Sequence, residues 1–495
     1  LRKPEKLPPI EADEVPFDIP RTWAWSRLAT LGQVNPKNDL DDSASVSFCP
    51  MALIPERYGD PVTFEVRKWG EIKSGYTHFA ENDVVVAKIT PCFQNGKAAV
   101  MRDLAGGAGA GTTELYVFRP IPGTLEPNYV LIFLKSPGFI DGGERRMTGT
   151  AGQQRVPRDY FEHTPIPVPP VAEQRRIVAK VHELMALCDE LEERQRWRAE
   201  KRVSVNRSAL HHLTTATDGP EFYGHWRRIR DHFDMLYEVP ETVAELRQAI
   251  LQLAVRGKLV PQDPNDEPAS VLLERIEAEK QRLYEAGKLR KPEKLPPIEA
   301  DEVPFEVPEG WVWVRFASIA RIATNLVQPD GYEDLPHIAP DSIEKATGRL
   351  LDYRTVGEDG VRSGKHRFFP GQILYSKIRP NLSKAVIVDF DGLCSADMYP
   401  IDAYISAQFL LNYILSATFL DMVTRHDTRV AMPKINQNAL AAIPVPVPPL
   451  SEQRRIVAKV DQLIALCDEL EAKLTAARTK AEHLASAVVH RVSAA

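Results

Sequence analysis

Apolar residues near the end of the chain recur at alternating spacings of four and three positions. These positions are Ile456, Val460, Leu463, Cys467, Leu470, Leu474, Ala477, Ala481, Leu484 and Val488. A mean spacing of about 3.5 residues keeps one apolar stripe facing a partner helix. Because Glu, Lys and Arg dominate the other positions, the pattern predicts a coiled-coil helix with solvated outer faces over 448–495.

The same stretch occurs earlier in the chain. Residues 173–191 read EQRRIVAKVHELMALCDEL, and residues 452–470 read EQRRIVAKVDQLIALCDEL. The earlier apolar stripe consists of Ile177, Val181, Leu184, Cys188 and Leu191. Two unrelated amphipathic helices are the alternative, which near-identity over this length disfavours. We therefore expect a second coiled-coil helix at 169–217 and expect the two helices to pair through their apolar stripes.

A second repeat sets the order of the domains. Residues 1–17, LRKPEKLPPIEADEVPF, recur unchanged at 289–305. Each copy precedes a pair of tryptophans, and each half ends in a proline-rich run, PIPVPP or PVPVPP, directly before the repeated helix. Long self-similarity of this kind indicates repeated structural units. The predicted order is a linker at 1–17, a domain at 18–168, a helix at 169–217, a connecting segment at 218–288, a linker at 289–305, a domain at 306–447 and a helix at 448–495.

The two inserted domains resemble each other. Residues 74–91 align without gaps on residues 363–380, and the short runs Val84–Ala87 and Ile373–Ser376 are typical of strands. Apolar residues at helical spacing predict helices near 127–135 and 406–420. The fold class is therefore α+β, with an irregular sheet and long loops in each domain.

The connecting segment is predicted to be helical. One helix is predicted to end near Gly257. A second is predicted to run from about Pro268 to Gly287, because proline suits the start of a helix and glycine suits its end. The identical linkers imply that a matching helical segment once preceded Leu1. We expect the natural protein to carry such a region, similar to 221–288.

Composition narrows the class of protein. The chain has 495 residues, enough for several domains, and 62 Lys and Arg against 68 Asp and Glu give a net charge of −6. This net charge is mildly unfavourable for a nucleic-acid binder. The local charge matters more for binding, because screening by salt limits the reach of a charge to about 10 Å. The five cysteines are scattered without a CxxC pair, which argues against disulfides or zinc and favours a reducing cytoplasm. No apolar run reaches membrane-spanning length, and no signal-peptide pattern is present.

The repeated motif P-[IV]-P-V-P-P-x-x-E-Q-R-R-I-V and the two variable domains resemble the specificity (S) subunit of type I restriction-modification systems. Residues 246–276 are similar to the conserved region of one branch of that family. The resemblance covers nearly the whole chain. It implies two target-recognition domains that each read half of a split DNA sequence, on two long antiparallel helices related by a pseudo-twofold axis. It further implies docking of methylation (M) subunits, probably two of them, and then of restriction (R) subunits. S-adenosylmethionine is then expected on the methylation partner, and ATP and Mg on the restriction partner.

The sequence offers no catalytic or metal site. Phosphate-loop, methyltransferase N/D-P-P-[YF] and metal-binding histidine motifs are absent. The glycines at 106, 107, 109 and 111 do not form G-x-G-x-x-G, and a flexible loop is the favoured interpretation. Cys188 and Cys467 lie on the apolar stripes, where we expect buried thiols.

Local basic clusters predict DNA contact. Residues 145–158 hold four arginines and no acid, and 349–384 hold eight basic residues against three acids. A solvated surface is the alternative for either cluster, but the clusters occupy matching places in both domains. Arg, Lys, Asn and Gln are the side-chain types that neutralise phosphates or pair with base edges. The candidates are Lys88, Asn95, Lys97, Arg145, Arg146, Thr148, Thr150, Gln153, Gln154, Arg155, Arg158, Lys365, Arg367, Lys377, Arg379, Asn381, Lys384, Arg425, Arg429, Lys434, Asn436 and Gln437.

Within these candidates, Lys88 and Lys377 are expected to meet phosphate, whereas the glycine-flanked loop residues 148–155 and the residues at 379–381 and 429–437 are expected to read bases. Trp23, Trp25, Trp311 and Trp313 are more typical of a protein core than of base stacking.

The apolar stripe from Ile456 to Val488 spans about 50 Å at 1.5 Å per residue, and one turn of DNA is about 34–36 Å. We therefore expect a DNA target with two short elements and an unread gap, asymmetric because the two domains differ. A DNA methyltransferase with its own recognition domain and a coiled-coil scaffold without a DNA role are the alternatives. The missing cofactor motifs disfavour the first, and the basic loops disfavour the second.

Overall fold

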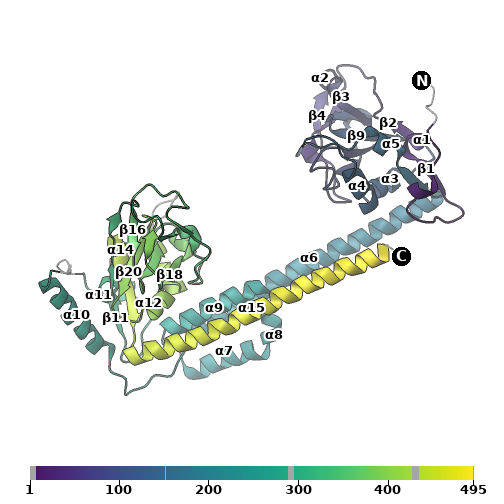
Figure 1. Cartoon of the computed structure of the whole chain (residues 1–495). Helices are drawn as coiled ribbons and strands as arrows, with labels where there is room; N and C mark the ends of the chain where they lie inside the picture. The colour runs from purple at the N-terminus through teal and green to yellow at the C-terminus, as the bar shows by residue number, and fades with distance from the viewer. Residues whose placement is uncertain (1–6, 151, 288–294, 426–433, 494–495) are drawn as a thin grey trace. The chain divides into compact units, whose positions relative to one another are not determined.

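The structure is a computed structural model that describes residues 7–150, 152–287, 295–425 and 434–493. The chain divides into two compact units, Leu1–Arg196 and Trp197–Ala495, and each is described by itself (Figure 1). The long helix α6 (Val171–Thr215) begins in the first unit and ends in the second.

The first unit contains three sheets. A two-stranded sheet pairs β1 with β10, a second has the order β2-β9-β6-β7, and a third has the order β4-β3-β8-β5. The strands are β1 (Ala24–Arg27), β2 (Gly32–Val34), β3 (Ser45–Cys49), β4 (Glu65–Lys68), β5 (Thr77–Ala80), β6 (Val84–Ala87), β7 (Ala98–Val100), β8 (Ala108–Gly111), β9 (Leu115–Pro120) and β10 (Pro165–Val168).

The second unit repeats this arrangement. Its sheets have the orders β11-β21, β12-β20-β17-β18 and β13-β16-β19-β14-β15. The strands are β11 (Val312–Arg315), β12 (Ala320–Ile322), β13 (Leu326–Val327), β14 (Pro336–Ile338), β15 (Arg354–Thr355), β16 (Lys365–Phe368), β17 (Ile373–Ser376), β18 (Ala385–Ile387), β19 (Gly392–Cys394), β20 (Met398–Ala403) and β21 (Pro444–Val447). Apart from β13, each strand has a counterpart in the first unit, including the parallel pair β3–β8, which corresponds to β14–β19.

Short helices accompany the sheets, and longer ones follow them. In the first unit these are α1 (Leu28–Leu31), α2 (Trp69–Ile72), α3 (Pro127–Leu134), α4 (Pro137–Glu144) and α5 (Arg158–His163). In the second they are α7 (Gly219–Asp231), α8 (Phe233–Leu236), α9 (Pro240–Val255), α10 (Ala269–Glu285), α11 (Phe316–Ile319), α12 (Ala407–Ile414), α13 (Ala417–Arg425), α14 (Gln437–Ala442) and α15 (Leu450–Ser493). The α+β fold class is confirmed.

An inner strand of one four-stranded sheet in each unit, β6 or β17, is buried on both faces. In β6, Val84 and Val86 point to a core that includes α3, α4 and α5, whereas Val85 points to the core between the two larger sheets. In β17, Ile373 and Leu374 divide in the same way between two cores. Alternate residues of a strand point to opposite faces, so a short apolar run without polar positions suits a strand between two layers.

The glycine run at 106–111 is a 3-10 turn followed by a strand rather than the predicted flexible loop. Residues 108–111 form buried β8, and Gly109 lies opposite Phe79 of β5. A Cβ atom on Gly109 would collide with the Phe79 ring and the Ser47 carbonyl. Gly392 of β19 lies opposite Phe368 in the same way. The glycines therefore make room for a large aromatic ring across the sheet.

The identical linkers are held by one buried arginine in each unit. Arg27 donates to the carboxylate of Glu14 and to the carbonyls of Pro8, Pro9 and His163. Arg315, in the second unit, makes the corresponding bonds to Glu302 and to three carbonyls. A guanidinium fork can satisfy several acceptors at once, which explains why the described linker residues, 7–17 and 295–305, make the same contacts in both units.

The glutamine of each EQRR motif fixes the long helix to its own domain. Buried Gln174 donates to the carbonyls of Thr124 and Pro169, at 3.1 and 2.9 Å, and accepts from the Glu126 N–H at 2.8 Å. Buried Gln453 donates to the Pro448 carbonyl and accepts from the Ser406 N–H. The motif therefore joins the first turn of the helix to its domain.

The apolar stripe of α15 packs against α9 (Figure 1). Ile456, Val460 and Cys467 are buried there, and Arg247 of α9 forms ion pairs with Asp468 and Glu471. The stripe is exposed farther along, at Leu484 and Val488.

The stripe of α6 in the first unit is half-buried at Ile177 and Val181 and exposed beyond them, at 48% for Leu184 and 50% for Leu191. Cys188 is exposed as well, contrary to the predicted buried thiol, because the first unit has no described helix that covers Cys188 as α9 covers Cys467. Direct pairing of the two long helices stays a prediction.

Two further differences concern helix boundaries. The helix predicted at 406–420 is two helices, α12 and α13, with a break where the Ser416 side chain bonds the Tyr413 carbonyl and accepts from the Phe419 N–H. The connecting segment contains α7 and α8 in addition to the two predicted helices α9 and α10. Among the described residues, no helix is both long enough and apolar enough to cross a bilayer.

Candidate DNA interface

Four side chains meet where β6 ends and β9 begins in the first unit. Arg155 donates from Nε and Nη2 to the two carboxylate oxygens of Glu114, at 2.9 and 2.8 Å. Lys88 Nζ lies 5.3 Å from the centre of the Tyr116 ring. The Tyr116 hydroxyl donates to the Val156 carbonyl, and the Lys88 N–H donates to the Glu114 carbonyl. We call Lys88, Glu114, Tyr116 and Arg155 the first cluster.

The second unit builds the same arrangement, the second cluster, from Lys377, Asp397, Tyr399 and Lys434. Lys434 Nζ lies 3.2 Å from Asp397 Oδ1, and Lys377 Nζ lies 5.3 Å from the centre of the Tyr399 ring. The backbone agrees as well, because Ile89 bridges to Arg155 and Ile378 bridges to Lys434. Lys88 therefore corresponds to Lys377, and Arg155 corresponds to Lys434.

The acid of the first cluster is held in its charged form. The hydrogen bond from Arg155 lowers the pKa of the Glu114 carboxyl, with smaller contributions from the charges of Arg155 and Lys88. Burial raises the pKa of the Tyr116 hydroxyl to about 12, so this tyrosine stays a neutral donor. At neutral pH the first cluster thus has two positive charges, one negative charge and a fixed aromatic ring.

In the glycine-flanked loop at 148–155, the described residues 148–150 and 152–155 form the two arms of a small hairpin beside the first cluster. Thr148 and Arg155 exchange backbone hydrogen bonds at 3.0 and 2.8 Å, and Gly149 and Gly152 have positive φ angles. Gln154 bonds to Thr90, both through its N–H to the Thr90 hydroxyl and through its carbonyl to the Thr90 N–H. The structure therefore brings the loop residues that are predicted to read bases next to Lys88.

The other candidates of the first unit differ in their freedom. Lys97 is 15% exposed and donates to the Met51 carbonyl, and Asn95 donates to Glu56. Arg158 pairs with Glu162 on α5. Arg146 is placed over the Tyr160 ring, 5.3 Å from its centre, and Arg145 is the C-cap residue that follows α4. Of these residues, Lys97 is held most firmly by its own domain.

In the second unit, Arg379 and Asn381 are exposed in the turn after β17. Arg379 has a φ angle of +46°, which non-glycine residues adopt at a cost of about 1–3 kcal/mol, often at functional sites. Its guanidinium makes no hydrogen bond or ion pair within the described part of the chain. Lys384, by contrast, is 15% exposed and donates to the Pro340 carbonyl at 2.7 Å.

The remaining candidates lie on β16 and around α14. Lys365 donates to Ser363, and Arg367 lies between the Tyr332 and Phe369 rings, 5.3 and 5.1 Å from their centres. Asn436 caps α14 by accepting from the Ala439 N–H, and Gln437 donates to Thr324 at 3.3 Å. Arg425 is the last residue of α13, and Arg429 lies outside the described residues.

Comparison with known proteins identifies the family. Residues 20–201 and 308–477 match the family described as type I restriction modification DNA specificity domain. The specificity subunit of the type I restriction enzyme EcoAI from Escherichia coli is 38% identical over 99% of this chain and 85% of its own length. The chain belongs to the family of type I restriction-modification specificity subunits. The predicted resemblance is therefore confirmed.

Two further comparisons agree. The specificity subunit of EcoEI from Escherichia coli is 37% identical over 99% of this chain and 85% of its own length. A solved chain from a study of complex assembly and conformational transition of the type I R-M system shares the fold, with a TM-score of 0.55, 19% identity, and coverage of 96% of this chain and 98% of that one. Specificity subunits are non-catalytic DNA-recognition subunits, and this chain is one of them.

Sequence reasoning missed the acids of the two clusters. Glu114 and Asp397 are acids, whereas the pattern that predicts DNA contact consists of basic, amide and hydroxyl side chains. A signal was present, since each acid stands two residues before a tyrosine, at Tyr116 and Tyr399, in matching stretches of the two domains. The structure shows that Glu114 pairs with Arg155 and that Asp397 lies within 4 Å of both Lys377 and Lys434.

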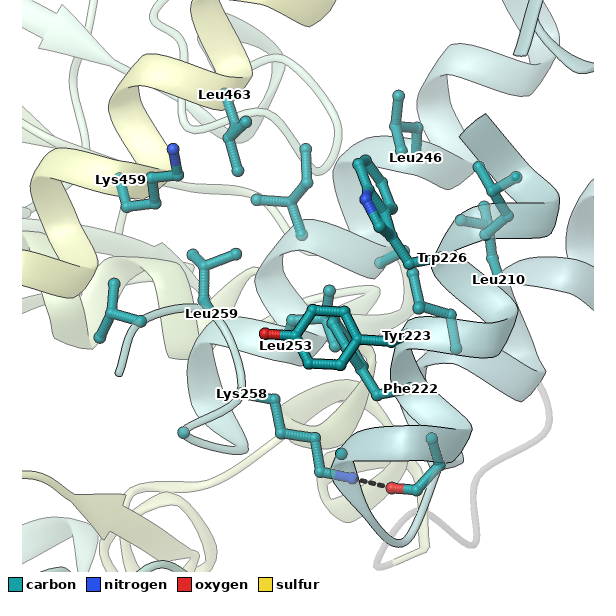
Figure 2. Close-up of a pocket in the computed structure, with 18 of the residues that line it drawn as sticks. Leu210, Phe222, Tyr223, Trp226, Leu246, Leu253, Lys258, Leu259, Lys459 and Leu463 are labelled. Atoms are coloured by element: carbon teal, nitrogen blue, oxygen red, sulfur yellow. Dashed lines mark hydrogen bonds between the residues drawn. The ribbon is translucent and has the colours of Figure 1, made fainter. Parts of the chain in front are cut away.

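The second unit of this specificity subunit also has an apolar groove of about 890 Å³, outside the recognition domain (Figure 2). Phe222, Tyr223 and Trp226 of α7 line it together with Leu253 of α9 and Leu463 of α15. Among the polar groups at the groove, Lys258 donates to the Ala216 carbonyl. An exposed apolar groove of this size is typical of a binding surface rather than of a hydrolytic site. In the described part of the chain, no group of three or more His, Cys, Asp or Glu side chains is placed to hold a metal ion.

Proposed function

We propose that this specificity subunit reads an asymmetric DNA sequence in two parts, one with each recognition domain, and positions methylation and restriction subunits on that sequence. The observation that carries the proposal is the pair of equivalent clusters, with the same backbone frame and different side chains at the reading positions. Two domains with the same backbone arrangement but different loop side chains are suited to recognise two different half-sites.

The side chains divide into two roles. Lys88 and Lys377 are placed at corresponding strand ends beside a fixed aromatic ring, and an ammonium held there supplies a phosphate contact that is independent of sequence. Arg155, Gln154 and Arg379 are on turns and carry the donor and acceptor groups that base edges recognise. These turns supply the sequence-dependent part of binding.

The partners follow from the family. We propose two methylation subunits, with S-adenosylmethionine bound on them, and restriction subunits that bind ATP and Mg. The long helices α6 and α15 are the proposed docking surface, because both have exposed apolar side chains such as Leu187 and Leu484. We propose that the subunit acts in the cytoplasm, where its DNA target lies.

The test uses the chain co-expressed with its methylation partner. The purified complex modifies a plasmid library with a randomised insert, and modified molecules are sequenced. We expect two short preferred elements separated by a gap of fixed length without base preference. A single continuous element, or no preference, would contradict the proposal.

A domain exchange supplies the control. Replacing residues 18–168 with the recognition domain of another family member should change one half-site and leave the other half-site and the gap unaltered. A change in both half-sites would contradict the assignment of one half-site to each domain.

A further inference from the structure

A carboxylate at the centre of a DNA-reading surface needs a specific reason to be there. Glu114 pairs with Arg155, Asp397 contacts both Lys377 and Lys434, and the side chains of the two acids remain 26% and 41% exposed. DNA phosphates repel a carboxylate, and phosphate and deoxyribose oxygens within a strand offer it no hydrogen-bond donor. The groups of duplex DNA that can donate to it are therefore on the bases.

In the major groove the donors are the exocyclic amino groups of adenine N6 and cytosine N4, whereas guanine and thymine present acceptor oxygens. A carboxylate accepts from the amino groups and is repelled by the keto oxygens. One carboxylate at a fixed position thus distinguishes an amino base from a keto base on the strand that it faces.

The cluster geometry leaves each acid capacity for such a bond. A carboxylate has about four lone-pair positions, and Arg155 uses one on each oxygen of Glu114. In the second cluster, Lys434 bonds to Oδ1 of Asp397, and Oδ2 has no hydrogen-bond partner among the described residues. The adjacent cations offset the repulsion between each acid and the DNA backbone, so the acid can approach a groove.

We propose that Glu114 and Asp397 are specificity-determining residues that each accept a hydrogen bond from the amino group of an adenine or cytosine, one in each half-site. This inference rests on the proposed function. Arg155 and Lys434 keep the carboxylates in place and charged. A purely structural role, in which the acid orients its cation and touches no base, is the alternative that the experiment excludes or establishes.

The experiment replaces each acid by its amide, as Glu114→Gln and Asp397→Asn, in the full chain co-expressed with its methylation partner. An amide presents both a donor and an acceptor, so it no longer rejects keto bases. We expect Glu114→Gln to reduce the discrimination between amino and keto bases by about 10- to 100-fold at one position of one half-site. Asp397→Asn should act in the same way at one position of the other half-site.

Selection from the randomised library measures this effect at every position. The matched control is Glu65→Gln, since Glu65 of β4 is an exposed acid that pairs with Arg67 in the same domain. The control should keep the wild-type preference. Because the two acids lie in different domains, each variant also tests the inference if the other fails to fold.

The outcomes separate the two levels of the argument. If the wild-type complex shows no two-part preference, the proposed function itself is wrong. If the wild-type shows it and the amide variants lose affinity evenly without a change at any base position, the acids are structural and the inference is overturned. An equal change in the Glu65→Gln variant also overturns it.

Discussion

The buried glutamine of the first EQRR motif offers a direct test of how the long helix is fixed. Methionine is close to glutamine in length and volume but cannot replace its hydrogen bonds. Gln174→Met removes three of them and leaves the Glu126 N–H and the carbonyls of Thr124 and Pro169 without that partner. Each lost bond costs about 0.5–1.5 kcal/mol, and more where the partner stays buried and unsatisfied. We expect the free energy of unfolding of the first unit to fall by about 2–4 kcal/mol.

For a unit of this size, 1 kcal/mol corresponds to about 2–4 °C in Tm, so the unfolding transition of the first unit should fall by roughly 5–15 °C. Calorimetry of the full chain measures the transition, and hydrogen exchange of the α3 amides shows whether the loss begins at this contact. The control is Gln195→Met, because Gln195 is an exposed residue of the same helix. A decrease below about 3 °C, or one equal to that of the control, would refute the assigned role.

Three other predictions test the linker, the helices and the spacing. The hydrogen bond from Arg27 lowers the pKa of the Glu14 carboxyl, so the ionised pair should hold residues 7–17 in place at a pH above the ordinary pKa of about 4.5 and release them as the pH falls through the lowered pKa. Limited proteolysis between pH 5 and 3 measures this release, and protection that does not depend on pH would contradict the prediction. Cys188 should react with a maleimide in the isolated chain, while Cys467, which burial shields and whose pKa burial raises to about 11, should not; protection of Cys188 would instead indicate that another helix covers it. Inserting seven residues into both α6 and α15 adds about 10 Å to each helix. The unread gap in the DNA target should then lengthen by about three base pairs, at 3.4 Å per base pair, while both half-sites stay the same. Altered half-sites would show that the helices do not set the spacing.

Much of the fold can be predicted from local sequence patterns. The runs 84–87 and 373–376 are β-branched and aromatic, which predicts strands, and the structure has strands there that are buried on both faces. The repeats identify the domain order, since near-identical segments fold alike. The helices α9 and α10 were predictable from apolar spacing and from proline and glycine at their ends.

The errors arose where tertiary packing decides. The run Ala108–Gly111 resembles a loop in sequence, and its strand state depends on Phe79, which is distant in the chain. The exposure of Cys188 could not be predicted, because the same heptad pattern is covered by α9 in one unit and exposed in the other. The role of Glu114 depends on Arg155, 41 residues away, so charge counting within one segment could not find it.

The anchors and the reading loops are separate parts of each domain. Gln174 and Gln453 join each domain to its helix, and the domains add a second contact, because Arg57 pairs with Asp189 of α6 and Arg349 pairs with Asp468 of α15. None of these bonds involves the residues that face the proposed base edges. The direction in which a domain presents its loops to DNA is therefore set by residues that need not change when the loops change. If each domain reads one half-site as proposed, we expect a new half-site to need substitutions in the loop at 148–155 or its counterpart in the second unit, and none in the EQRR motifs.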